Sequence, residues 1–206
     1  MSDVLVVAAH PDDEAFGCGG SLCRDVAAGA RVHEIALTSG EQGGHGIEQA
    51  GQVREAEARE AAGILGLQAI EFWRQPDGRL RASRELVERL RQRLEQLRPE
   101  TVYAPHERDD HPDHQAAARL VMRAARALRS PPRLRMFEIW TPIEQIDEVI
   151  DITEHLERKV AAIRAYRSQG SVMRFDEAFT GLSRFRGEMH SWPGGDHAEV
   201  FRCPQL

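Results

Sequence analysis

The chain has 206 residues and a net charge of −6, with 41% hydrophobic and 29% charged residues. This composition is typical of a soluble globular protein, and the acidic balance gives no support for a polyanionic partner. No stretch approaches the ~20 apolar residues of a membrane span, residues 1–3 lack the basic region of a signal peptide, and three cysteines do not suggest a disulfide framework. We therefore expect a single domain over residues 1–206, located in the cytoplasm, with no membrane partner.

The first predicted strand covers residues 4–9, a short apolar run rich in β-branched side chains. His10, Asp12 and Asp13 follow it, so the carboxyl end of this strand delivers an imidazole and two carboxylates. Pro11 stiffens the turn, because proline fixes φ and has no backbone donor. His10 and Asp13 suit a divalent metal, but a catalytic zinc takes three protein ligands and keeps a fourth position for water. The sequence therefore predicts a third ligand elsewhere in the chain.

A helix is predicted over residues 15–29, followed by a second strand over 32–37. The glycines within 17–20 raise a dinucleotide-binding interpretation. That fingerprint opens immediately after its strand, whereas here residues 10–14 intervene, so the spacing argues against it. The glycines are expected instead to let the helix pack closely on the sheet.

The glycine-rich loop over residues 40–46 follows the second strand at the same edge of the sheet. We expect this loop to contact substrate, with Glu41 as a substrate-binding residue and His45 as a weaker polar contact. The next predicted helix, over residues 48–65, carries Arg54 in its first half. Considered alone, Arg54 is most simply a surface arginine paired with a neighbouring glutamate.

A second cluster of histidines and carboxylates occupies residues 106–114, directly after a predicted strand over 101–105. Between the two clusters lie a short strand over 70–73 and a strongly amphipathic helix over 83–97. Residues 106–114 therefore have the same structural context as His10 and are the best source of the missing metal ligand.

The alternation of strands and helices predicts an α/β domain of Rossmann-like, doubly wound type, with a mostly parallel sheet and helices on both faces. In such sheets ligands gather beyond the carboxyl ends of the strands, where the strand order reverses. We expect the strands over 4–9 and 101–105 to be neighbours at that point. Their adjacency would bring His10 together with the 106–114 cluster.

A stripe of arginines runs along and beyond the next predicted helix, which covers residues 114–128. This is the one feature that favours nucleic-acid binding, but a single short helix is a small footprint and no aromatic residue lies within the stripe. We therefore expect no nucleic-acid partner, and a homo-oligomer interface or a solvated face accounts better for the stripe. Its members are Arg119, Arg123, Arg126, Arg129, Arg133 and Arg135.

The last third of the chain has weaker signals. A tryptophan, Trp192, lies in a glycine-rich loop that either walls a pocket or packs into the core. The predicted elements are strands over 134–140 and 149–152, a helix capped by Thr153 and running to residue 166, a helix over 176–188 and a final strand over 198–201.

Two sequence motifs, AHPDDE at residues 9–14 and HPDH at 111–114, resemble the signatures of the LmbE/PIG-L family of zinc-dependent de-N-acetylases. The pair is specific, whereas either motif alone would be weaker. Supporting matches are LTSGE at 37–41, REAE at 54–57, PDGRL at 76–80 and YRSQ at 166–169.

The resemblance implies that His10, Asp13 and His114 are the metal ligands and that Asp12 is the general base. Elementary chemistry agrees, because a metal held by two imidazoles and one carboxylate lowers the pKa of bound water towards ~7 and polarises an amide carbonyl. Zinc is the expected metal, although the same ligand types accept other divalent transition metals.

The resemblance also assigns three residues around the metal. His111 matches a histidine that stabilises the developing charge on the substrate carbonyl or protonates the leaving amine. Asp113 matches the carboxylate partner of that histidine, and Arg54 matches an arginine near the substrate. The resemblance therefore implies a substrate-binding role for Arg54 in place of a surface ion pair.

The expected reaction is hydrolysis of an acetamide on a small N-acetylglucosamine-like sugar or glycoside. An alternative with the same metal site is an amidase that acts on a sugar-thiol conjugate. A third interpretation, less favoured, is a non-catalytic nucleic-acid-binding module that uses the arginine stripe over residues 119–135.

Overall fold

A five-stranded sheet with the strand order β3-β2-β1-β4-β5 forms the centre of the molecule, and every neighbouring pair in it is parallel. This is a computed structural model, and it describes residues 2–44, 46–190 and 196–206. His45 and Trp192 therefore lie outside the described residues. The strands are β1 (Asp3–Ala8), β2 (Arg31–Thr38), β3 (Ala69–Gln75), β4 (Thr101–Pro105) and β5 (Arg133–Phe137).

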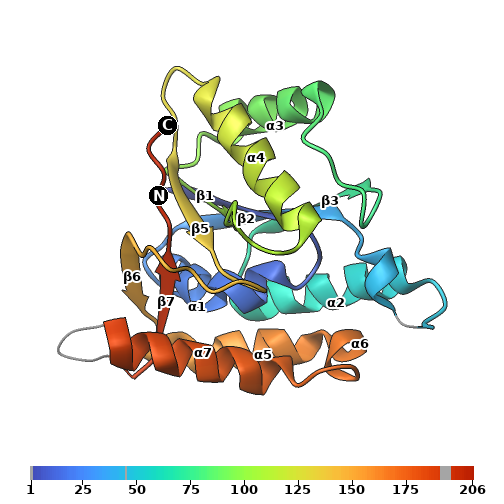
Figure 1. The fold of residues 1–206 in the computed structure, drawn as a ribbon, viewed down its shortest axis with the longest axis vertical. Helices are drawn as coiled ribbons and strands as arrows, with labels where there is room; N and C mark the ends of the chain where they lie inside the picture. The colour runs from blue at the N-terminus through green and yellow to red at the C-terminus, as the bar shows by residue number, and fades with distance from the viewer. Residues whose placement is uncertain (1, 45, 191–195) are drawn as a thin grey trace.

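Helices cover both faces of this sheet, as predicted (Figure 1). On one face lie α3 (Arg84–Leu97) and α4 (Pro112–Arg126), and on the other lie α1 (Asp13–Ala27) and α2 (Ala50–Leu65). No helix within the described ranges is long and apolar enough to cross a membrane. The α/β prediction with a mostly parallel sheet is confirmed.

The last third of the chain adds a further layer beneath α1 and α2 (Figure 1). An isolated antiparallel bridge between Met136 and Arg202 connects the end of the chain to β5. The elements of this part are β6 (Glu148–Asp151), α5 (Leu156–Ala165), α6 (Arg167–Gly170), α7 (Phe175–His190) and β7 (Ala198–Phe201), and β6 pairs with β7 in an antiparallel two-stranded sheet.

Strand β1 is apolar from Val4 to Ala8, because both of its faces are buried there. Val4 and Val6 pack into the core on the α1 side, whereas Leu5 and Val7 pack into the core on the α3 and α4 side. Successive side chains of a strand point to opposite faces, so a central parallel strand needs apolar residues at every position. The continuous apolar run therefore marks β1 as an interior strand.

The position of β1 between β2 and β4 brings the two histidine clusters to one edge of the sheet. Val4 pairs with Thr101 and Val6 with Tyr103, so β1 and β4 are neighbours, as predicted. Helix α1 begins at Asp13 just after β1, and helix α4 begins at Pro112 shortly after β4. The clusters meet at the point where the strand order reverses.

Two predictions about the last third of the chain are wrong in detail. The strand expected over 134–140 ends at Phe137, because the chain turns at Glu138, whose carboxylate accepts from the Ile143 amide at 2.6 Å. Thr153 does not cap a long helix: it opens a short 3₁₀ turn, and α5 begins only at Leu156. The Thr153 hydroxyl instead donates to Asp151 Oδ1 at 2.7 Å, a local bond that competes with helix capping.

A buried ion pair joins the last layer to α1. Lys159, 2% exposed, donates from Nζ to Glu199 Oε1 at 2.6 Å and to the Phe16 carbonyl at 2.8 Å. Glu199 also accepts from the amides of Gly20 and Ser21. The pair therefore fixes α5 and β7 against the helix whose first turn carries Asp13.

Removing one member of this pair should destabilise the fold strongly. Lys159→Met is expected to lower the free energy of unfolding by about 3–5 kcal/mol, because the substitution leaves the Glu199 carboxylate buried without its cation. Urea denaturation of the purified variant measures this change. Arg167→Met, which breaks the exposed Arg167–Glu60 pair, is the control and should leave the free energy of unfolding nearly unchanged, because solvent screens this pair. Equal losses in the two variants would contradict the prediction.

Candidate active site

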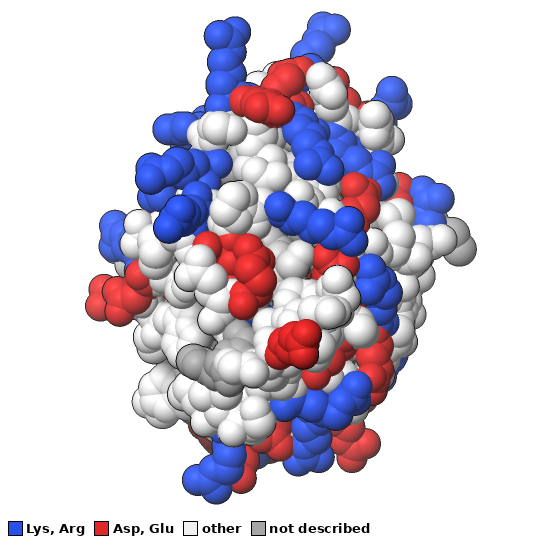
Figure 2. Space-filling model, turned by 90° about the vertical axis from the view of Figure 1, so that its right-hand side faces the viewer, with Lys and Arg blue, Asp and Glu red and all other residues white. Residues whose placement is uncertain are grey.

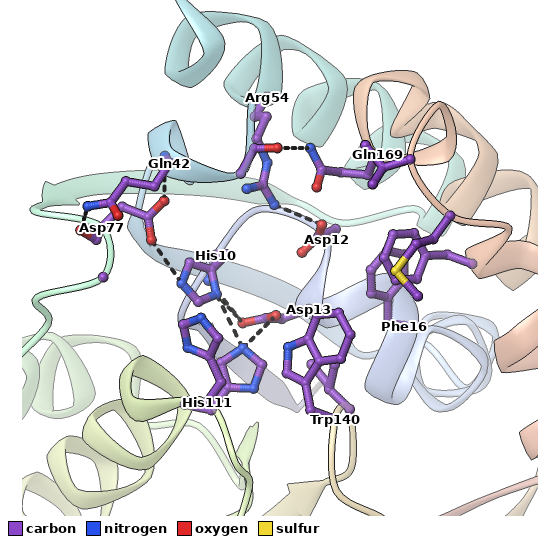
Figure 3. Close-up of a pocket in the computed structure, with 17 residues that line it drawn as sticks. His10, Asp12, Asp13, Phe16, Gln42, Arg54, Asp77, His111, Trp140 and Gln169 are labelled. Carbon is purple, nitrogen blue, oxygen red and sulfur yellow. Dashed lines mark hydrogen bonds and ion pairs between the residues drawn. The ribbon is translucent and has the colours of Figure 1, made fainter. Parts of the chain in front are cut away.

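Six of the eight predicted site residues line a single cavity of about 280 Å³ at the carboxyl edge of the sheet (Figure 3). The turn after β1 and the start of α1 contribute His10, Asp12 and Asp13. The start of α4 contributes His111 and His114, and Arg54 comes from α2. Asp113 and Glu41 are not among the residues that line this cavity.

Three side chains converge at the centre of the site. Nδ1 of His10 lies 3.2 Å from Nε2 of His114, which in turn lies 3.2 Å from Oδ1 of Asp13, and His10 Nδ1 lies 3.7 Å from Asp13 Oδ2. Tetrahedral zinc with bonds of about 2.0–2.1 Å separates its ligand atoms by roughly 3.4 Å. All three side chains are buried. Their spacing and donor types therefore fit a divalent transition metal.

Carboxylates stand behind both imidazoles, on the side away from the convergence point. Nε2 of His10 lies 3.1 Å from Asp77 Oδ1 and 3.4 Å from Asp113 Oδ2. Nδ1 of His114 lies 3.1 Å from Asp109 Oδ1, although it makes no well-aligned hydrogen bond among the described residues. Metal-binding histidines usually have such outer partners, which fix the tautomer and the ring orientation. This arrangement leaves one nitrogen of each ring for a metal.

The surrounding carboxylates make the centre strongly attractive to a cation. Burial acts to lower the pKa of His10, but hydrogen bonds to Asp113, Asp13 and Asp77 outweigh it and raise the pKa well above its usual value. For His114, burial likewise acts to lower the pKa, but Asp13 and Asp109 raise it to about 9. The negative field that holds a proton on each ring is the field that would hold a metal ion in its place.

Asp12 adopts an unusual backbone conformation beside the metal ligands. Its φ of 112° lies in the left-handed region, which aspartate tolerates better than most residues. Burial raises the pKa of Asp12 to about 6, while the charge of Arg54 acts to lower it and that of Asp13 to raise it. The amide of Asp12 donates to Glu14 Oε2 at 3.1 Å, and Glu14 Oε1 accepts from the Tyr166 hydroxyl at 2.6 Å. These bonds tie the Asp12 backbone to the last layer.

Arg54 is a buried residue of the site, 4% exposed, and not the surface arginine that the residues alone suggested. Its Nη2 donates to Asp12 Oδ2 at 2.8 Å and to the Pro11 carbonyl, and its Nη1 donates to the Gly40 carbonyl. Gly40 has a φ of +63°, and a Cβ there would lie 2.2 Å from Arg54 Nη1. Only glycine leaves room for this guanidinium, which holds Asp12 in place.

The carboxylate of Asp113 does not contact His111, in contrast to the expected pairing. It accepts from the amides of Gly78 and Leu80 at 2.7 and 3.0 Å and faces His10. His111 instead accepts on Nδ1 from the Asp113 backbone amide at 3.2 Å, and its ring meets the edge of His10. Asp113 is therefore placed to orient His10. Burial and the neighbouring His10 and His114 lower the pKa of His111.

Glu41 lies in a 3₁₀ turn, Glu41–Gly44, beside the site. Its Oε1 accepts from the Asp77 amide at 3.0 Å, and the side chain lines a separate hollow with Glu55 and Arg74. The structure does not bring Glu41 into the main cavity, so substrate binding by this residue stays a prediction. Its observed contact supports the turn that carries Asp77 to His10.

Several residues of the site were not predicted from the sequence. Asp109 was visible within the 106–114 cluster and Asp77 within its turn, but neither spacing revealed which ring each would face. Gln42 and Gln169 also line the cavity. The apolar wall had no sequence signal, because its members come from separate segments that meet only in three dimensions: Phe16, Ile139, Trp140, Val172, Met173 and Phe175.

The fold and the buried histidine–carboxylate centre are typical of α/β enzymes whose active site lies where the strand order of the sheet reverses. A family model described as PIG-L, GlcNAc-PI de-N-acetylase, matches residues 5–125, more than half of the chain. The chain therefore belongs to this family of deacetylases, and the resemblance of its motifs is confirmed. The matched range contains both histidine motifs.

Individual proteins that resemble this chain in sequence or in structure have different names and activities. The 1D-myo-inositol 2-acetamido-2-deoxy-alpha-D-glucopyranoside deacetylase of Mycolicibacterium vanbaalenii is 30% identical over 82% of this chain and 81% of that protein. The conserved protein TT1542 of Thermus thermophilus is 38% identical, with a TM-score of 0.87, over 100% of this chain and 95% of that one. The 4-carboxy-2-hydroxymuconate hydratase GalB of Pseudomonas putida is 26% identical, with a TM-score of 0.88, over 100% and 98%. Because a hydratase shares the fold, the reaction must be argued from the site.

Proposed function

We propose that this protein is a zinc-dependent hydrolase that removes the acetyl group from an N-acetylglucosamine-like sugar or glycoside. The observation that carries the proposal is the approach of His10 Nδ1 and Asp13 Oδ1 to His114 Nε2, each at 3.2 Å. These three residues would hold the metal, and other divalent transition metals suit the same donors. Bound there, the metal would supply Lewis-acid chemistry, lowering the pKa of water and polarising the amide carbonyl.

Asp12 is positioned to accept the proton of the attacking water. Arg54 occupies its Oδ2 at 2.8 Å, so Oδ1 is the oxygen left for water. Burial and the neighbouring Asp13 raise the pKa of Asp12, which makes this carboxylate a better base than an exposed one. The Arg54 contacts hold it in one orientation and reduce the reorganisation that proton transfer requires.

His111 is positioned to act on the other side of the reacting carbonyl. Its Nδ1 accepts from the Asp113 amide, so the neutral ring carries its proton on Nε2. This N–H can donate to the oxygen on which negative charge develops, a contribution of roughly 3 kcal/mol for other positioned donors. Charge stabilisation by a neutral His111 is thus better supported than proton delivery by an imidazolium.

The wall opposite the polar centre suits an acetylated sugar. Phe16 and Phe175 stack with ring centroids 4.8 Å apart, and Trp140 meets Phe175 edge-on. Aromatic faces pack against the apolar faces of sugars and the acetyl methyl, while Gln42 and Gln169 offer polar contacts. The named relative, a deacetylase of an acetamido-glucopyranoside, supports a substrate of this class.

The test combines metal analysis with acetate release. Purified protein is expected to carry close to one zinc per chain and to release acetate from N-acetylglucosamine and its methyl glycoside. A chelator should abolish this release, and added zinc should restore it, because the ligands stay folded around the vacant position. Restoration by cobalt or nickel alone would correct the choice of metal.

Zinc binding without acetate release from a panel of N-acetylated sugars would contradict the deacetylase proposal. The same protein would then be tested for longer amides on sugar-thiol conjugates. Acetate release that persists after complete metal removal would contradict the metal-dependent mechanism.

A further inference from the structure

We propose that four arginines beside the active site, Arg79, Arg81, Arg119 and Arg123, bind an oxyanion group of the substrate, a phosphate or a carboxylate. The group would lie on the substrate beyond the N-acetylated sugar. The assignment to substrate rests on the proposed function, whereas the anion site itself rests on the geometry of the four side chains.

The four arginines line one hollow of about 350 Å³, named the arginine groove. Arg79 and Arg81 come from the segment between β3 and α3, and Arg119 and Arg123 come from the exposed side of α4. Arg123 Nη1 donates to the Ala82 carbonyl at 3.1 Å, which fixes the two segments together. Figure 2 shows basic side chains gathered over the upper part of this side of the molecule.

None of the four guanidinium groups forms an ion pair among residues 2–44, 46–190 and 196–206, although most arginines elsewhere in those ranges do. Among the residues that the structure describes, Asp113 is the one acid that lines the groove. Its carboxylate is buried and already accepts from Gly78 and Leu80. In a chain of net charge −6, four unpaired cations around one hollow form a local site for an anion.

The groove adjoins the reaction cavity through one shared residue. Gly78 lines both hollows, and its amide donates to Asp113 Oδ2, which lies 3.4 Å from Nε2 of His10. Asp113 therefore contacts the predicted metal ligand His10 and lines the arginine groove. A substrate whose sugar lies at the metal can therefore extend past Gly78 into the groove.

A compact oxyanion fits this place better than a nucleic acid. Arginine presents a planar fork of donors that matches phosphate or carboxylate oxygens. A nucleic acid would need a longer basic track, commonly with stacking aromatics. Within the described part of the chain, no aromatic residue lines this hollow. The groove thus favours a glycoside that carries one anionic group.

The experiment compares N-acetylglucosamine 1-phosphate with the neutral methyl glycoside of N-acetylglucosamine in steady-state deacetylation. The double variant Arg81→Gln/Arg119→Gln removes two groove charges, and neither residue holds the backbone. Arg126→Gln/Arg129→Gln is the matched control: it removes two exposed arginines of the same stripe that do not line the groove.

The groove variant is expected to raise KM for the phosphorylated substrate about tenfold, leaving kcat and the kinetics of the methyl glycoside unchanged. The control should match the parent protein on both substrates. The tenfold effect should shrink at high salt, because exposed charges are screened. No change in KM, or equal changes for both substrates, would overturn the proposal, as would equal effects of the control.

If neither substrate loses its acetyl group, the proposed function fails while the anion site remains testable. Titration calorimetry with inorganic phosphate should then show binding that the groove variant weakens and the control does not. Absence of phosphate binding in that case, or tighter salt-dependent binding of short RNA abolished by the groove variant, would overturn the oxyanion assignment.

Discussion

Asp12→Asn is expected to lower kcat about 10²- to 10⁴-fold while the protein keeps its full zinc content, since this is the usual contribution of a positioned general base. Asparagine has the same shape as aspartate and tolerates the left-handed backbone at φ 112° at least as well. Its side-chain oxygen can still accept from Arg54. The substitution therefore removes the proton acceptor and leaves the surroundings in place.

Single-turnover acetate release and elemental analysis on the same sample measure the two effects together. Asp110→Asn is the matched control, because Asp110 is an exposed carboxylate of the same rim that does not line the cavity. It should retain the parent rate within about twofold. A large loss of zinc from Asp12→Asn would mean that Asp12 is a metal ligand.

His114→Ala is expected to weaken zinc binding by more than about 100-fold, because even the loss of an outer partner typically costs 10- to 100-fold in affinity. The side chain is fully buried, and its Nε2 faces both His10 and Asp13. Competition with a metal-sensitive dye measures the affinity, and acetate release should fall with the metal content.

His111→Ala separates two candidate ligand sets. Nitrogen atoms of His10, His111 and His114 all lie within 4.8 Å of one another. Three imidazoles are therefore a geometric alternative to the set in which Asp13 is the third ligand. If Asp13 is the third ligand, His111→Ala keeps its zinc and loses rate, whereas Asp13→Ala loses zinc. If His111→Ala loses its zinc and Asp13→Ala keeps it, then His111 and not Asp13 is the third metal ligand.

This chain is similar both to a sugar deacetylase and to a hydratase, so the reaction must be argued from the residues of the site. A metal centre that polarises a carbonyl and activates water can serve either chemistry. The buried Asp12–Arg54 pair and Trp140 line the cavity around this centre. Activity assays should therefore first compare substrates that differ in the group around the amide, and only then compare metals.

The fold class and the two segments that meet in the site can be predicted from the residues alone. The apolar run over residues 4–9 predicts an interior strand, because only a strand buried on both faces needs an apolar side chain at every position. The polar cluster after it and the one after residues 101–105 then fall at the same edge of a parallel sheet. These inferences depend on local periodicity and chain order, which are read directly from the residues.

The orientation of individual side chains in the site depends on tertiary packing and could not be predicted. Asp113 was expected beside His111 but faces His10, and Arg54, expected near the substrate, is buried against Asp12. The wall formed by Trp140 and Phe175 and the arginine groove each join segments that are far apart in the chain. Such contacts depend on how helices and turns pack and on which partner a buried charge must find, and neither is encoded in the spacing of residues along one segment.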